Sequence, residues 1–179
     1  MTLRDIAKSA AAVLQADDIE YALDRGETGD DVRVIAKCVN MALAEMSGDG
    51  FPLCERQVLT ARDGVIPLSS FSRAPTGVRE TTADGKRVAF TVDSLGVHVP
   101  RDGEYCVTYC FAFKDSELDD KAELGALCDK YVATYLTARN YCLITGRTDE
   151  ASIWDQRYNA EAEKLRLTRR ARIQGRKWL

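Results

Sequence analysis

The sequence predicts an α+β fold that is mainly α: a helical bundle of about four helices, a small antiparallel β insert between the helix pairs, and a basic C-terminal tail. Two observations predict this class. Apolar residues recur at steps of three and four near both ends of the chain, whereas between 53 and 113 they alternate with polar ones. The 179 residues are 45% hydrophobic and 30% charged, which is typical of a folded domain. We therefore expect a single domain over 1–163 and a tail over 164–179.

Two helices are expected at the N-terminus. An apolar stripe that begins at Leu3 predicts a helix over about 3–21. Two glycines then interrupt the pattern. A second helix is expected over 30–46, because Asp30 and Asp31 stand where carboxylates complement a helix N-terminus and apolar residues follow at helical spacing.

The β insert is expected over 53–113. Its strongest signal lies between Glu104 and Phe113, where aromatic and β-branched residues alternate with smaller ones. Three Asp-Gly pairs separate the apolar runs and predict hairpin turns, since glycine accepts the positive φ that tight turns require. These pairs are Asp63-Gly64, Asp84-Gly85 and Asp102-Gly103. We expect roughly four to six short antiparallel strands.

Two longer helices are expected after the β insert. Residues 121–144 place apolar side chains on one stripe, and Gly146 ends that helix. Thr148 is a suitable N-cap for a last helix over 149–168. Helices joined by so few residues pack antiparallel, so we expect all four helices to form one bundle from which the β insert projects.

The charge is divided unevenly along the chain. Residues 164–179 include seven basic side chains and no acidic one, and subtracting +7 from the total of −3 leaves −10 for 1–163. The tail allows three interpretations: a solvated terminus, an anchor that docks on an acidic, grooved partner, or a strip that neutralises nucleic-acid phosphates. In the anchor interpretation Trp178 fills a pocket of the partner.

The residues that catalysis or metal binding would need are scarce. His98 is the only histidine, and we find no carboxylate at a suggestive spacing from it, so no catalytic triad is expected. The six cysteines contain no CxxC pair and are expected to be reduced thiols that bind no metal. Neither GxGxxG nor GxxxxGK[ST] occurs. We therefore expect no enzyme and no cofactor.

An acidic cluster between the β insert and the third helix admits a simpler interpretation than a divalent-cation loop. Its members are Asp115, Glu117, Asp119, Asp120 and Glu123. They lack the alternating register of a calcium loop, so we interpret them as an exposed loop whose charge favours the following helix N-terminus. No apolar run approaches the roughly 18 residues of a membrane helix, and the first residues lack the features of a signal peptide. An intracellular protein without membrane contact is expected.

Four strings of the sequence resemble the head-to-tail adaptor proteins of tailed bacteriophages. Three belong to the β insert: ARDGVIPLSSF from Ala61, GKRVAF from Gly85, and YCVTYCF from Tyr105, which leads into Leu118-Asp119-Asp120. The fourth is YLTARNYCLITGRTDEASIWDQR from Tyr135, which looks like the paired C-terminal helices of that group and is followed by a basic end closing in RKWL. The resemblance covers most of the chain and is weakest over 1–50.

The resemblance implies a virion structural protein of the phage neck, made in the cytoplasm of the host bacterium. It implies a ring of copies of the chain, commonly twelve, below the portal protein, with packaged DNA passing through the lumen without sequence-specific binding. In that family the C-terminal segment reaches the portal, which assigns portal binding to Arg169, Arg170, Arg172, Ile173, Arg176, Lys177, Trp178 and Leu179. Two alternatives stay open: a tail-completion or stopper protein of the neck, and a small nucleic-acid-binding regulator.

Overall fold

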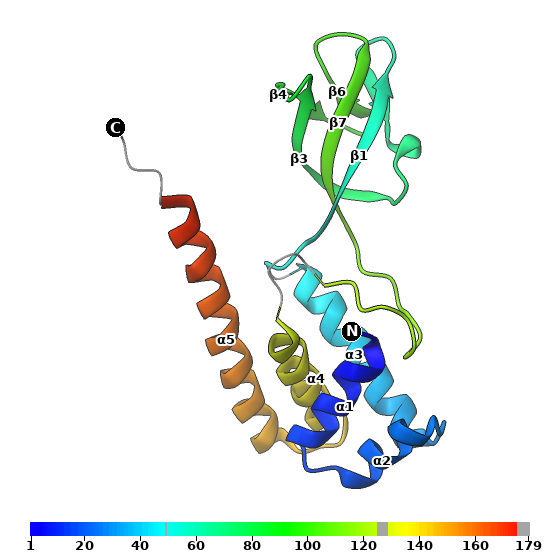
Figure 1. The fold of residues 1–179 in the computed structure, drawn as a ribbon, viewed down its shortest axis with the longest axis vertical. Helices are drawn as coiled ribbons and strands as arrows, with labels where there is room; N and C mark the ends of the chain where they lie inside the picture. Colours follow the sequence, from blue (N-terminus) through cyan, green and yellow to red (C-terminus); the bar gives the residue numbers. More distant parts are fainter. Residues whose placement is uncertain (49, 125–128, 175–179) are drawn as a thin grey trace. The chain divides into compact units, whose positions relative to one another are not determined.

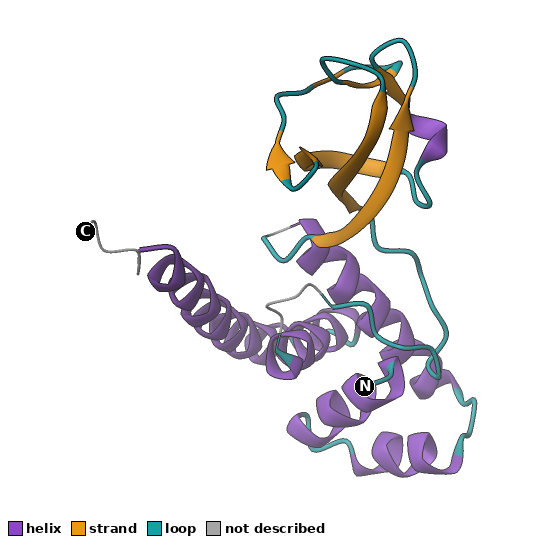
Figure 2. Ribbon diagram, turned by 45° about the horizontal axis from the view of Figure 1, so that its top comes forward, coloured by secondary structure: helices purple, strands orange, loops and turns teal. Residues whose placement is uncertain are grey.

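The computed structural model describes residues 1–48, 50–124 and 129–174, and for 168–174 it describes the backbone alone. Within these ranges the chain divides into two compact units. A helical unit comprises Met1–Phe51 with Lys114–Leu179, and a β unit comprises Pro52–Phe113. Figure 2 colours the strands orange, and all of them belong to the β unit, which also includes a short 3-10 helix at Leu68–Ser70.

The predicted fold class is wrong. The described residues form five helices and two antiparallel sheets of four and three strands, 48% helical and 25% strand, which is a mixed α/β fold and not a helical bundle with a small β insert. The physical reason is that the β segment has a hydrophobic core of its own, with eleven buried residues drawn from both sheets. The helices are α1 (Leu3–Val13), α2 (Asp17–Arg25), α3 (Asp30–Gly48), α4 (Lys130–Ile144) and α5 (Thr148–Gln174).

In the β unit the strands are β1 (Leu53–Ala61), β2 (Val65–Pro67), β3 (Pro75–Ala83), β4 (Lys86–Arg87), β5 (Thr91–Val92), β6 (Gly96–His98) and β7 (Gly103–Phe111). One sheet has the order β1-β7-β3-β4 and the other β2-β6-β5 (Figure 1). The alternation predicted for the last strand is present, since Tyr105, Val107 and Tyr109 are buried in the core. Ile66 and Val97 of the smaller sheet are buried in the same core.

The Asp-Gly pairs form tight turns in two of the three predicted places. Asp63-Gly64 joins β1 to β2 with φ of 51° and 70°, and Asp84-Gly85 joins β3 to β4 with φ of 50° and 73°. Asp102-Gly103 is not a hairpin turn, because β6 and β7, the strands on either side of it, belong to different sheets. There the Asp102 carboxylate accepts a hydrogen bond of 2.7 Å from the Gly64 amide.

The predicted first helix, 3–21, is two helices. Gln15 has a φ of +56°, which ends α1, and Asp17 and Asp18 lie in the first turn of α2, where carboxylates complement the helix dipole. The break lets Ile19 and Leu23 reach the core, which a straight continuation of the α1 stripe would not allow. The second predicted helix, 30–46, is observed as α3.

The third predicted helix, 121–144, begins later than expected, at Lys130. The segment before it forms backbone hydrogen bonds with the N-terminal residues instead: the Leu3 amide donates to Asp120, the Arg4 amide to Leu118, and the Ala122 amide to the Met1 carbonyl. Backbone groups used in this way cannot also form helical hydrogen bonds. The last helix, predicted over 149–168, extends to Gln174 and so includes much of the predicted tail.

Candidate partner-binding site

Helices α4 and α5 form a helical hairpin. Asp129 caps α4 by accepting a hydrogen bond from the Tyr131 amide at 3.3 Å. Gly146 in the turn has a φ of 77°, which glycine adopts without the penalty that a Cβ atom would bring. Asp149 and Glu150 lie in the first turn of α5, where their charge complements the helix dipole. The helices pack against each other, as the short turn predicts.

One stripe of α5 is buried. Its members, spaced at helical intervals, are Ala151, Trp154, Tyr158 and Ala162. The Trp154 ring stacks on Tyr135 of α4, with centroids 6.0 Å apart and an angle of 20° between the planes. The exposed Arg157 places its guanidinium 4.7 Å from the centroid of the Trp154 ring, within the range of a cation–π contact. Aromatic contacts therefore hold the first half of α5 against α4.

Arg139 of α4 joins three helices. Its Nη2 atom donates to Glu45 Oε2 of α3 at 2.5 Å, and its Nη1 atom donates to Asp155 Oδ1 of α5 at 3.1 Å. The Arg139 side chain is 18% exposed. Burial lowers the pKa of Arg139, but its hydrogen bonds to the two carboxylates raise that pKa by more. The guanidinium thus stays charged and fixes the positions of α3 and α5 relative to α4.

The C-terminal half of α5 continues beyond the helix that it packs against. α5 has 27 residues and α4 has 15, so at about 1.5 Å per residue α5 is roughly 18 Å longer. Figure 1 shows the far end of α5 without a helix of its own unit beside it. Leu167 in this extension is about half exposed. This end of α5, from Lys164 to Gln174, is the candidate partner-binding site.

The eight residues predicted to bind the portal fall at or beyond this end of α5. Arg169, Arg170, Arg172 and Ile173 lie in its last turns by their backbone, and nothing is described of their side chains. The other four lie outside the described residues: Arg176, Lys177, Trp178 and Leu179. The predicted anchor therefore stays a prediction.

The acidic cluster is a loop of the helical unit, and its predicted effect on a following helix is wrong. α4 begins only at Lys130, so the carboxylates do not lie in its first turn. Asp119 instead forms an ion pair with Arg4 of α1 at 2.7 Å, and the hydrogen bond from Arg4 lowers the pKa of Asp119. Asn40 of α3 holds the loop by two hydrogen bonds of 3.0 Å with the Ser116 backbone.

A hollow of about 700 Å³ lies between this loop and α3. Its lining includes Arg33 and Val32 of α3 and the four carboxylates from Asp115 to Asp120. The surface is therefore acidic on one side and lies on the helical unit alone. It gives that unit an anionic surface distinct from the basic end of α5.

Sequence reasoning missed two polar pairs. His98 Nε2 lies 2.9 Å from Asp93 Oδ2, and this hydrogen bond lowers the pKa of Asp93. Asp93 directly follows β5 and His98 is the last residue of β6, so the two are five positions apart in sequence. The sequence pattern gave no sign of this contact. Among the described residues no hydroxyl or thiol bonds to the His98 ring, so the pair lacks the nucleophile of a triad. The second pair is Arg139 with Asp155, and its signal was present: apart from Lys130, Arg139 is the only charged residue of α4.

The described ranges contain no group of three or more His, Cys, Asp and Glu side chains placed to hold a metal ion. None of the helices within those ranges combines the length and the apolar character that a membrane span requires. Fold and site together define a two-unit α/β protein whose last helix extends beyond its packing partner. Neither a scan against models of protein families nor a search of curated proteins finds a significant match to this chain.

Proposed function

We propose that this protein is a head-to-tail adaptor of a tailed bacteriophage, a virion protein that assembles with copies of itself into a ring below the portal. The observation that carries the proposal is the α4–α5 hairpin. It coincides with the string from Tyr135 to Arg157 that resembles the C-terminal helices of adaptors, and several residues of that string form its contacts and its turn. Tyr135 stacks on Trp154, Arg139 bonds to Asp155, and Gly146 forms the turn.

The length of α5 supports a role in assembly. The helix continues roughly 18 Å beyond the end of α4, and within this extension the Arg166 guanidinium lies 5.8 Å from the centroid of the Phe51 ring of the same unit. Its sequence is rich in cations, with Lys164, Arg166, Arg169, Arg170 and Arg172 before Gln174. A second protein with an acidic surface is the partner that would cover it, and the portal is that partner in our proposal.

The charge distribution supports a ring around DNA. Subunits that contact one another head to tail need two different surfaces, and closure of the rotation gives a ring. The helical unit and the β unit of each subunit offer two such surfaces, and the net charge of −10 over 1–163 leaves the body of the subunit acidic. An acidic lumen lets a duplex slide, because it repels phosphate where a basic wall would hold it by releasing counterions.

The test is attachment to the purified portal ring from the same virion. A variant truncated after Thr168, and Trp178→Ala in the full chain, should remain folded by circular dichroism, with only the signal of the removed last turns of α5 lost in the truncated chain, and both should lose portal attachment in electron micrographs. Lys86→Gln is the matched control, because it removes an exposed cation from β4 and should attach normally. Normal attachment by the truncated chain would remove the proposed anchor.

The nucleic-acid-binding alternative rests on the same basic residues and makes a different prediction. A regulator would bind duplex DNA with an affinity that falls steeply with salt and disappears on truncation after Thr168. The adaptor should bind duplex DNA weakly at 150 mM salt and should appear at the junction of head and tail in native particles. A labelled chain found elsewhere in the particle, or absent from it, would contradict the adaptor proposal.

A further inference from the structure

Two cysteines face each other across neighbouring strands of the β unit. Cys54 of β1 is paired in register with Cys110 of β7, and their Sγ atoms are 3.1 Å apart. Residues opposite each other in antiparallel strands have Cα atoms about 4.5–5.5 Å apart, within the roughly 4.4–6.8 Å that a disulfide spans. The two sulfurs can therefore bond by a small side-chain rotation, without any slip of the strands.

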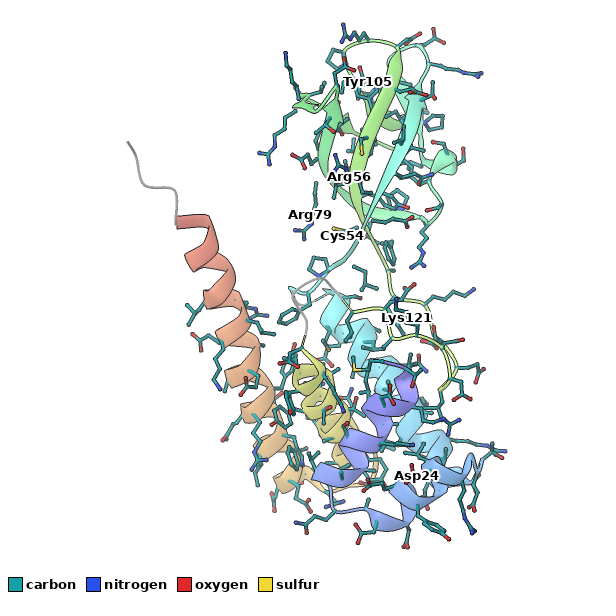
Figure 3. All side chains as sticks on the ribbon, in the orientation of Figure 1. Asp24, Cys54, Arg56, Arg79, Tyr105 and Lys121 are labelled. Atoms are coloured by element: carbon teal, nitrogen blue, oxygen red, sulfur yellow. The ribbon has the colours of Figure 1, made fainter. Side chains whose placement is uncertain are left out.

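The pair lies where the chain enters and leaves the β unit. Cys54 is the second residue of β1, and Cys110 is the last but one of β7 (Figure 3 labels Cys54 at this end of β1). The two residues are 56 positions apart in sequence, so a bond between them would enclose nearly all of Pro52–Phe113. Cross-links that close long loops restrict the unfolded chain most.

Two arginines contact sulfurs on this face of the sheet. Arg79 of β3 donates its Nε–H to Cys110 Sγ at 2.8 Å, and Arg56 of β1 donates to Cys106 Sγ at 2.8 Å. The hydrogen bond to Cys110 is the largest cause that raises the pKa of Arg79. A guanidinium beside a sulfur stabilises the negative charge that develops there during thiol–disulfide exchange.

The other described thiols lack this arrangement. Cys106 is opposite Val58 in the β1–β7 register and lies four residues from Cys110 on the same strand, about 13 Å away in an extended chain. Cys38 and Cys142 are fully buried in the helical unit, and burial raises the pKa of Cys38 to about 11. Cys54 is exposed, so an oxidant from solution reaches it first.

We propose that Cys54 and Cys110 form a dithiol that small-molecule disulfides oxidise to a cross-strand disulfide. The Cys54 thiolate attacks one sulfur of the small disulfide, forms a mixed disulfide and releases the first small thiolate. The Cys110 thiolate then attacks Cys54 Sγ and releases the second. Two cysteine thiols are oxidised, one disulfide is reduced to two thiols, and the two cysteine protons pass to the departing thiolates.

The timing of this step rests on the proposed function. A chain made in the bacterial cytoplasm is reduced there, whereas a released virion meets an oxidising medium. The disulfide would then form after assembly and close the β unit. The chemistry itself depends only on the geometry of β1, β3 and β7.

The experiment uses the purified full-length protein, first reduced and then incubated with mixtures of reduced and oxidised glutathione. After quenching by acid and alkylation, peptide mass spectrometry should find Cys54 linked to Cys110 as the main disulfide, reversed by dithiothreitol. The thermal midpoint of the β unit should rise by roughly 10 °C on oxidation. Cys54→Ser, an exposed site whose substitution keeps the fold, should abolish both changes, and Cys106→Ser should leave both intact.

A stable glutathione adduct on Cys54 without the intramolecular link, or a main link between other cysteines, would overturn the inference. So would oxidation that leaves the thermal midpoint unchanged. The outcome is independent of portal attachment. If the disulfide forms and portal attachment is absent, the adaptor proposal fails and the dithiol proposal stands. If the protein attaches to the portal and the disulfide does not form, the dithiol proposal fails and the adaptor proposal stands.

Discussion

The two units of this protein are built from the chain in different ways. The β unit is one continuous stretch, Pro52–Phe113, and its two sheets share an apolar core. The helical unit is assembled from both ends of the chain, and charged contacts join its parts: Arg4 with Asp119, 115 residues apart, and Arg139 with Glu45, 94 residues apart. The β unit is therefore closed by strand pairing within one stretch of the chain, whereas the helical unit, which also has an apolar core, is closed by contacts between the two ends of the chain, and some of these contacts are polar.

The largest expected effect comes from opening the β core. Ile66→Ala removes a fully buried side chain and should lower the free energy of unfolding of the β unit by about 3 kcal/mol. Hydrogen exchange read by mass spectrometry should show lost protection in Pro52–Phe113 and unchanged protection in α1, α3 and α4. Val58→Ala, at a side chain 63% exposed, should change little. Equal loss in both units would contradict two separate cores.

A smaller effect is expected when the polar junction of the helical unit is removed. Arg139→Ala leaves Glu45 and Asp155 without their shared cation and should cost about 2 kcal/mol, measured by urea denaturation of the helical unit. Arg33→Ala is the control, because its ion pair with Asp30 is exposed on both sides and should cost less than about 0.5 kcal/mol. If Arg139→Ala cost no more stability than Arg33→Ala, the contacts of Arg139 would not be what joins the distant segments of the helical unit.

The smallest effect concerns the start of α1. Thr2 and Asp5 form a capping box, in which Thr2 Oγ1 accepts from the Asp5 amide and Asp5 Oδ2 accepts from the Thr2 amide at 2.7 Å. Thr2→Ala should cost about 1 kcal/mol, and Thr2→Ser should restore most of it. Denaturation followed by the helical circular dichroism signal measures both. A Thr2→Ser variant as unstable as Thr2→Ala would show that the hydroxyl is not what matters.

The same box predicts a pH dependence with a definite sign. The hydrogen bond from the Thr2 amide lowers the pKa of Asp5 in the folded state. The stabilisation that the ionised Asp5 carboxylate contributes to the folded state is therefore complete above its unfolded pKa of about 3.9. This stabilisation is lost as the pH falls through the lower folded pKa. Asp5→Asn should thus be less stable than the native protein at pH 7, and the difference should shrink as the pH falls below the unfolded pKa and vanish below the lowered folded pKa. A difference that grew on acidification would have the wrong sign.

The difference between contacts that are close in sequence and contacts between distant segments explains how much of the fold could be predicted from the sequence. The β7 alternation, two Asp-Gly turns and α3 were predicted because each depends on residues close together in the chain. The late start of α4 could not be predicted, because it depends on hydrogen bonds between Met1–Arg4 and a segment more than a hundred residues away. The fold class was wrong for a related reason. Periodicity located the strands, but not the fact that they enclose a core of their own.

The candidate site was predicted in part. The basic composition of 164–179 was evident from the sequence, but the extension of α5 to Gln174 was not, because polar residues without an apolar stripe give little helical signal. Arg139 was visible as a charge in an otherwise uncharged stretch of α4, and its partners lie on other helices. Only tertiary structure reveals such partners.

The insertion of the β unit between the two halves of the helical unit has a consequence for synthesis. On the ribosome, Pro52–Phe113 is complete and able to fold while α4 has not yet been translated. Helices α1 and α3 must wait, because α4 covers the apolar sides of both. The nascent polypeptide therefore exposes hydrophobic helix faces next to an already folded neighbour, and translation of residues 130–144 ends that vulnerable interval.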